Sequence, residues 1–338
     1  MNKAIDRIIK RFFGSQKTPG MIVTAVKDSR IIYEGTMGET CLKTGIPVDP
    51  QTAFHMASVT KLFVGTAVVQ LWEKGLLALD QPVVGYLPRF RLKDPRHTKI
   101  TSAHILSHTS GMPDFDSDPW SEPSYDDHAL ARFVTTFVAG KHLTGDPGQA
   151  YQYCNTLYEV LGDLVAVVSG QLFEDYVQDH ILLPLGMNHS TLYKTRIPAR
   201  RLAMPHVVDG DQVSESPVFP YNRMHAPSST MYSTVGDMGR WLLANLNRGC
   251  LDGVRILKSD SFDRLWQPVN EKIPTIGLSW HRRRFKETPC VYHGGSDVGF
   301  RSYLALLPQR NAGVFAAANA IPCAVEDLVE ELLEVLAT

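Results

Sequence analysis

The sequence predicts an α/β protein of the α+β type: an antiparallel β-sheet formed from both termini and flanked by helices, with an inserted helical domain. Three observations support this prediction. Residues 21–26 and 30–34 near the start, and 302–307 and 313–318 near the end, are short apolar runs typical of strands. Residues 58–205 instead repeat their apolar side chains mostly at helical spacing. An amphipathic helix is expected beside the strands at each terminus.

The N-terminal residues predict a helix that packs against the core. It places five large apolar side chains on one face: Ile5, Ile8, Ile9, Phe12 and Phe13. Charged residues interrupt every apolar run here, so neither a secretory leader nor a stable membrane insertion is expected, and a cytoplasmic location is favoured. Residues 27–29 then form a plausible tight turn, which predicts antiparallel pairing of the first two strands.

The middle of the chain is mostly helical in pattern. Its first helix begins near Ser58 and ends near Gly75, and because it is apolar nearly all round it should be buried. An irregular loop rich in Asp, Pro and Ser is expected over residues 112–128. Four shorter helices are predicted over residues 101–108, 129–138, 156–169 and 173–181.

Strands return in the last third of the chain, where a turn at residues 308–311 joins the final two. We therefore expect a sheet domain formed by residues 1–57 and 206–338, a helical domain formed by residues 58–205, and an active site in the cleft between them. A closing helix places six apolar side chains on one face: Val325, Leu328, Val329, Leu332, Leu333 and Leu336.

Composition excludes several classes of function. The 338 residues carry a net charge of -1, so no basic bias indicates nucleic acid as a partner. The five cysteines form no C-x-x-C pair, and no zinc-protease, phosphate-loop or dinucleotide-binding motif occurs, so neither a metal nor a cofactor is expected. The sequence does not indicate an oligomeric state.

The most informative motif is Ser58-Val59-Thr60-Lys61. Residues three apart on a helix share a face, so the amine of Lys61 can reach the hydroxyl of Ser58 and remove its proton. The N-terminal end of a helix also favours the negative charge that develops on a serine alkoxide. The alternative is a serine that caps the helix and a solvated lysine one turn later, but a lysine on a buried helix needs a chemical reason.

A second motif, Tyr153-Cys154-Asn155, follows the first in the order that this chemistry needs. The hydroxyl of Tyr153 could relay a proton between the serine and the lysine, as acid or base. The amide of Asn155 could hold a substrate carbonyl or the lysine amine. The alternative is a loop tyrosine and an asparagine that caps the helix beginning at Thr156.

The third motif contains His293, Gly295 and Ser296 and resembles the end of an edge strand. Its glycines would let a substrate lie close against the backbone. The N–H of Ser296 could then form an oxyanion hole with that of Ser58, and His293 could donate to the substrate or to the base pair. The alternative is a glycine-rich turn with an ordinary histidine.

Two further features are expected to be structural. Lys43-Thr44-Gly45 lies in a polar stretch before Ser58 and is interpreted as a surface turn. The acidic residues of the irregular loop are expected to be solvated, although they would disfavour anionic substrates if they overhang the site. These residues are Asp114, Asp116, Asp118, Glu122, Asp126 and Asp127.

With these motifs the chain resembles the serine β-lactamase and penicillin-binding-protein superfamily. The closer similarity is to the class C β-lactamase-like hydrolases, which include family VIII carboxylesterases and D-peptidases. Landmarks of that group are matched by residues 54–61, 105–111, 183–187 and 233–238, and the similarity spans roughly residues 18–320.

The resemblance implies a β-lactamase/transpeptidase-like fold, an acylated nucleophile at Ser58, a base pair of Lys61 and Tyr153, and a substrate contact at Asn155. His293 stands where many relatives carry a lysine that helps to hold a substrate carboxylate. The permanent cation is therefore missing here, and four arginines are candidates to restore it: Arg282, Arg283, Arg284 and Arg301.

The sequence thus predicts a serine hydrolase that works through an acyl-enzyme on small-molecule esters or small amides. Several alternatives stay open. The chain could be a D-amino-acid peptidase or carboxypeptidase, a β-lactamase, or an acyltransferase in which an alcohol or amine replaces water. It could also be a non-catalytic binding protein that kept the fold.

Overall fold

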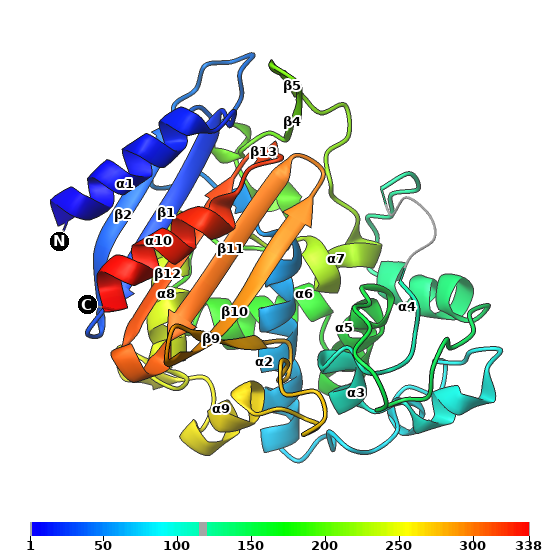
Figure 1. Ribbon diagram of the computed structural model, residues 1–338. Helices are drawn as coiled ribbons and strands as arrows, with labels where there is room; N and C mark the ends of the chain where they lie inside the picture. Colours follow the sequence, from blue (N-terminus) through cyan, green and yellow to red (C-terminus); the bar gives the residue numbers. More distant parts are fainter. Residues whose placement is uncertain (1, 115–119, 338) are drawn as a thin grey trace.

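The computed structural model describes residues 2–114 and 120–337, and its central feature is a six-stranded antiparallel sheet (Figure 1). The strand order is β2-β1-β12-β11-β10-β9, so strands from the two ends of the chain meet at the β1–β12 pair, as predicted. The strands are β1 (Gly20–Lys27), β2 (Arg30–Gly38), β9 (His281–Phe285), β10 (Thr288–Asp297), β11 (Phe300–Leu307) and β12 (Ala312–Ala318).

Each face of the sheet has its own core, because successive residues of a strand point to opposite faces. Val23 and Val314 belong to the cluster formed with the first and last helices, whereas Ile22 and Phe315 belong to the larger cluster on the other face. Figure 1 shows α1 and α10 lying across the near face of the sheet and α8 behind it. The helices are α1 (Asn2–Ser15), α2 (Lys61–Glu73), α3 (Ser102–Leu106), α4 (Ala129–Phe133), α5 (Thr156–Ser169), α6 (Phe173–Val177), α7 (Ala226–Ser229), α8 (Val235–Leu246), α9 (Ser259–Trp266) and α10 (Val325–Ala337).

The helical segment follows the predicted order, with different helix ends. Ser58 lies in a 3₁₀ turn, η1 (Ala57–Thr60), and the α-helical hydrogen bonding of α2 begins only at Lys61. The predicted helices at 129–138 and 173–181 each start as a short α-helix and continue as a π-helical turn, η4 (Val134–Val138) and η5 (Gln178–Leu182). Periodicity alone does not distinguish these two forms of helix.

The sequence did not indicate several short strands. They form a three-stranded sheet of β13 (Ala320–Ile321), β4 (His206–Asp209) and β5 (Gln212–Glu215), and two small pairs, β3 (Phe54–His55) with β6 (Tyr232–Ser233) and β7 (Cys250–Leu251) with β8 (Val254–Arg255). Strands of two to four residues are too short to show alternation. The expected surface turn at Lys43-Thr44-Gly45 is confirmed, since all three residues are exposed in a turn.

The prediction that His293 lies near the end of an edge strand was wrong, because its strand, β10, is not at the edge of the sheet. β10 lies between β11 and β9, and β9 forms the edge. The pairing with β9 stops at the Tyr292–His281 pair, whereas the pairing with β11 continues to Asp297. Residues 293–297 therefore extend beyond β9 and have one edge without a strand partner.

One apolar cluster joins the sheet to the central helices: Ile22 and Phe315 of the strands belong to it together with Leu62 of α2 and Leu161 of α5. The division into domains 1–57 plus 206–338 and 58–205 stays a prediction. No single helix in the described part of the chain is long and apolar enough to cross a membrane. Helix α5 and the following helix formed by α6 and η5 would be long and apolar enough only if they were counted together, and they are bent by 77° relative to each other.

Truncating a buried apolar side chain of α10 tests the expected docking of the closing helix. Leu333 is fully buried against the sheet, so Leu333→Ala should lower the free energy of unfolding by about 2–5 kcal/mol. Its neighbour Glu334 is exposed and pairs only with Lys286, so Glu334→Ala should change that free energy by about 1 kcal/mol or less. Urea unfolding measures both variants, and equal effects would contradict the packing.

Candidate active site

A strained turn presents Ser58. Ala57, immediately before it, has a φ of 47°, a left-handed conformation that costs a non-glycine residue about 1 kcal/mol or more. Two hydrogen bonds hold it: the Ala57 N–H donates to His55 Nδ1 at 3.1 Å, and the Thr60 hydroxyl donates to the Ala57 carbonyl at 2.6 Å. Ser58 is consequently the partly exposed residue of a turn whose other residues are buried.

Lys61 is fully buried, and its amine lies against the serine. The Nζ–Oγ distance to Ser58 is 3.0 Å, and Nζ also donates to the Ser228 carbonyl at 2.6 Å. Burial lowers the pKa of Lys61 to about 8, and the carboxylates of Glu159 and Asp114 oppose the decrease. At pH 7 roughly one Lys61 side chain in ten is therefore a neutral amine, far more than for a free lysine, and it lies beside a hydroxyl from which it can accept a proton.

Tyr153 lies in the segment just before α5, and its side chain reaches the same serine. Its ring stacks on the imidazole of His108, with ring centroids 4.2 Å apart, and lies 5.3 Å from Lys61 Nζ. Burial raises the pKa of Tyr153 above its usual value, and a hydrogen bond with Ser58 opposes this rise. Tyr153 is therefore a neutral phenol at physiological pH, which can donate a proton or pass one on, but is not a standing phenolate.

Asn155 is held by Asp114, not by the lysine amine. The Asp114 carboxylate accepts from Asn155 Nδ2 and from the Asn155 backbone N–H, each at 2.7 Å. Asp114 also accepts from the Thr156 N–H at 3.3 Å, so it caps α5, whereas the Asn155 side chain makes no capping bond. One Nδ2 hydrogen is used by Asp114, so the second Nδ2 hydrogen and the amide oxygen of Asn155 are left for a substrate.

Gly295 makes room for the protein's own backbone, and the substrate contact expected there stays a prediction. A Cβ at this position would lie 2.6 Å from the Met56 carbonyl oxygen and 3.0 Å from Ala57 Cβ. Glycine thus allows the turn that carries Ser58 to approach β10 closely. The Ser302 hydroxyl strengthens this contact by donating to the Met56 carbonyl at 2.6 Å.

His293 lies behind this contact and is 1% exposed. Its Nδ1 is 2.7 Å from the Gly294 carbonyl, and its ring centroid is 5.0 Å from that of His281. Burial lowers the pKa of His293 well below its usual value, and the neighbouring His281 and Lys61 lower it further. His293 is therefore neutral and supplies no cation in place of the lysine of related proteins.

A cavity of about 180 Å³ opens beside Ser58. Three of the residues that the sequence singled out line this cavity: Ser58, Asn155 and Ser296. Four others do not line it: Lys61, Tyr153, Gly295 and His293. The remaining lining residues are Trp120, His225, Ser228, Ser229 and Asp297.

Sequence reasoning missed the buried Glu159–His225 pair beside this cavity. Glu159 is fully buried, accepts from the Ser228 N–H at 3.2 Å, and lies 3.2 Å from His225 Nδ1. Burial raises the pKa of Glu159, and the contact with His225 opposes the rise. Glu159 thereby orients the Ser228 segment, whose carbonyl binds the Lys61 amine. The signal available was a glutamate on an otherwise apolar helix.

None of the four candidate arginines lines the cavity. Each has a partner away from the cavity: Arg301 donates to Glu326 at 2.7 Å, Arg283 pairs with Glu330, Arg284 with Glu287, and Arg282 donates to the Pro274 carbonyl. These residues therefore do not restore the positive charge that the family resemblance implied for binding a substrate carboxylate.

Of the acidic loop, Asp114 alone among its described residues contacts the predicted site residues. Asp126 pairs with Arg132, and Asp127 pairs with Arg223. Asp116 and Asp118 lie outside the described residues. Within residues 2–114 and 120–337, no cluster of three or more His, Cys, Asp or Glu side chains is placed to hold a metal ion.

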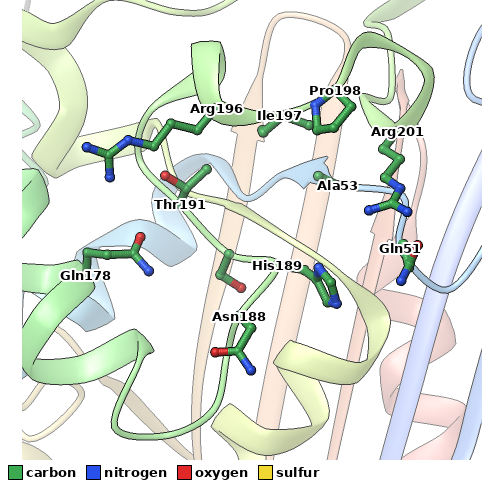
Figure 2. Close-up of a pocket in the computed structure, with 11 residues that line it drawn as sticks. Gln51, Ala53, Gln178, Asn188, His189, Thr191, Arg196, Ile197, Pro198 and Arg201 are labelled. Carbon is green, nitrogen blue, oxygen red and sulfur yellow. The ribbon is translucent and has the colours of Figure 1, made fainter.

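A larger hollow of about 440 Å³ contains none of the predicted site residues. Figure 2 shows Arg196 and Arg201 on opposite sides of it, with His189 between them. Ser190 also lines this hollow, but its hydroxyl donates to the Asp237 carboxylate at 2.7 Å. Ser190 thus contacts a carboxylate, and among the described residues no lysine amine like the one beside Ser58 lines this hollow.

The beta-lactamase family profile matches residues 5–335. The chain belongs to the beta-lactamase family. Among curated relatives, Protein flp of Staphylococcus aureus strain MW2 is 28% identical over 332 residues, which cover 97% of this chain and 65% of that protein. Penicillin-binding protein 4 of Amycolatopsis lactamdurans is 30% identical over 311 residues, which cover 88% and 80% of the two chains. This chain therefore spans about two thirds of the flp length.

Solved structures agree with this family membership. The octameric penicillin-binding protein homologue from Pyrococcus abyssi superposes with a TM-score of 0.80 at 24% identity, covering 99% of this chain and 77% of that one. The D-amino acid amidase from Ochrobactrum anthropi SV3, complexed with L-phenylalanine, gives a TM-score of 0.83 at 21% identity, covering 100% and 99%. At these identities the similarity establishes the fold, and the predicted β-lactamase/transpeptidase-like architecture is confirmed.

Adding a methyl group at Gly295 tests the close approach of β10 to the nucleophile turn. Gly295→Ala should force the strand or the turn to shift, and should slow phosphonylation of Ser58 by a fluorophosphonate roughly tenfold or more. Gly85→Ala is the matched control, because no atom lies within 4 Å of the added Cβ there. Labelling of both variants at the wild-type rate would contradict the constraint.

Proposed function

We propose that this chain is a serine hydrolase that forms an acyl-enzyme at Ser58, with esters or small amides as substrates. The observation that carries the proposal is the 3.0 Å contact between Ser58 Oγ and the buried Lys61 amine, at the wall of a cavity large enough for a small acyl group. A structural lysine would be expected to extend to solvent or to pair with a carboxylate, and Lys61 does neither.

In the acylation step, Ser58 Oγ attacks the substrate carbonyl carbon while its proton passes to the neutral Lys61 amine. The tetrahedral intermediate then collapses, the bond to the leaving group breaks, and the leaving oxygen or nitrogen takes up a proton. Tyr153 is suited to deliver that proton, because it is a neutral phenol in contact with Ser58. Water attacks the ester of Ser58 in the second half of the reaction, with the proton path reversed.

The hairpin of β10 and β11 supports the assignment of Ser296 to the oxyanion hole. Asp297 and Phe300 are paired across a two-residue turn and so form a hydrogen-bonded pair. The next pair, Ser296 with Arg301, is then not hydrogen-bonded, and the Ser296 N–H points away from β11, toward the edge that β9 leaves open. Together with the Ser58 N–H it would bind the developing oxyanion.

The acyl-enzyme is tested by mixing the protein with p-nitrophenyl butyrate and following nitrophenol release together with intact mass. The expected result is a burst of nitrophenol and a butyryl adduct on Ser58, neither of which appears with Ser58→Ala. Ser214→Ala, at an exposed serine of β5, is the matched control and should react like the wild type. Unchanged turnover by Ser58→Ala would refute the nucleophile assignment.

The lowered pKa of Lys61 predicts the pH profile of the same reaction. Lys61 accepts the serine proton only as a neutral amine, so kcat/KM for a neutral ester should rise about tenfold per pH unit and level off above about pH 8. Without burial the plateau would lie near the ordinary lysine pKa of 10.5. Lys61→Arg keeps a cation but cannot lose its proton, and should abolish the rise. A rate independent of pH from 6 to 9 would contradict a lysine base.

A further inference from the structure

The Asp297 carboxylate faces the cavity beside Ser58, at a position that neither the motifs nor the comparisons assign to any role. Three neutral groups donate to it: the Ser229 hydroxyl, the Val298 N–H at 2.8 Å, and the side chain of Trp120. An ionised carboxylate offers about four acceptor positions, so this set leaves it room for a further donor.

No cation of the described chain pairs with Asp297. No lysine, arginine or histidine of residues 2–114 and 120–337 lies within ion-pair distance of it, and Lys61 affects it only as a nearby charge. The one other titratable lining residue, His225, is engaged by Glu159. Burial raises the pKa of Asp297 to about 6, and its carboxyl group is mainly ionised above that pH. The cavity wall thus carries an anion with which no cation of the described residues forms an ion pair.

We propose that Asp297 binds the ammonium group of the substrate, so that Ser58 acts on aminoacyl esters or amides with a free amino group. The proposal rests on the proposed function, because it names the substrate class of the Ser58 site. A protonated amine would complete the coordination of the carboxylate by a charge-assisted hydrogen bond. Asn155 also lines the cavity, and its amide oxygen is a second possible acceptor for the same kind of group.

The size of the cavity supports an amino-acid-sized substrate. At about 180 Å³ it is smaller than the roughly 300–1,000 Å³ of sites that hold drug-sized ligands. Ser58 and Asp297 both line this small volume. A substrate whose carbonyl is at Ser58 and whose amine is at Asp297 should therefore have these two groups close together, as an amino acid derivative does.

The same charges disfavour substrates that carry a carboxylate. The cavity has an anionic wall at Asp297. The carboxylates of Glu159 and Asp114 are close enough to raise the pKa of Lys61, so they add to the negative electrostatic potential around the site. None of the candidate arginines lines it, and His293 is neutral. A penicillin or a peptide C-terminus would bring a second negative charge into this volume.

The test compares the p-nitrophenyl esters of alanine and of propionic acid, which share the leaving group and differ by the amino group. Wild-type protein should show the higher kcat/KM with the alanine ester after subtraction of spontaneous hydrolysis. Asp297→Asn keeps an acceptor for Ser229 but removes the charge. It should lower the ratio of kcat/KM for the alanine ester to kcat/KM for the propionate ester roughly 10- to 100-fold. Asp80→Asn, at an exposed aspartate away from the cavity, is the matched control and should leave the ratio unchanged.

A second measurement needs no variant. Alaninamide should inhibit the reaction of wild-type protein with p-nitrophenyl butyrate competitively, and propionamide at the same concentration should inhibit it far less. Equal inhibition by the two amides, or an equal loss of rate on both esters in Asp297→Asn, would overturn the ammonium site and leave Asp297 with a positioning role only.

Failure of this inference is distinguishable from failure of the proposed function. If p-nitrophenyl butyrate leaves no adduct on Ser58, the nucleophile assignment fails, and the ammonium site fails with it. If the adduct forms but the amino group makes no difference to rate or inhibition, the serine hydrolase stands and Asp297 is not its ammonium site.

Discussion

The amine of Lys61 lies in the protein interior with Ser58 Oγ and the Ser228 carbonyl as its hydrogen-bonding partners. An ammonium in such surroundings is poorly solvated, and the protein offsets the penalty in part with carboxylates that do not touch it, above all Glu159. This balance places the pKa of Lys61 between that of a free lysine and that of a fully desolvated one. The segments around it are arranged to keep this burial: α2 carries the lysine, α5 carries Glu159, and α7 provides the carbonyl.

A steric constraint joins this interior to the sheet. The nucleophile turn is strained at Ala57, and β10 can approach it only because residue 295 is a glycine. The same strand then continues past the end of β9, which leaves its last residues with one free edge next to the cavity. The site is thus formed by a few residues from the segment before α2, from the helical segment and from β10 near the end of the chain.

Electrostatics distinguishes this site from the pattern that the family resemblance implied. A neutral His293 replaces a permanent cation, the nearby arginines are paired elsewhere, and Asp297 faces the cavity. Under the proposed function, the serine–lysine pair depends on contacts within the interior, whereas the charge of the substrate would be selected by the lining of the cavity.

Sequence by itself determined the fold class, the strands at 21–26 and 313–318, the closing helix, and the pairing of Ser58 with Lys61. Each of these follows from short-range periodicity or from a fixed offset along a helix. Tertiary structure decided what such patterns do not encode. The role of Gly295, the neutrality of His293, the capping by Asp114 and the place of Asp297 all depend on contacts between segments far apart in the chain. Burial and charge at a site are sums over those contacts, so they exist only once the chain has folded.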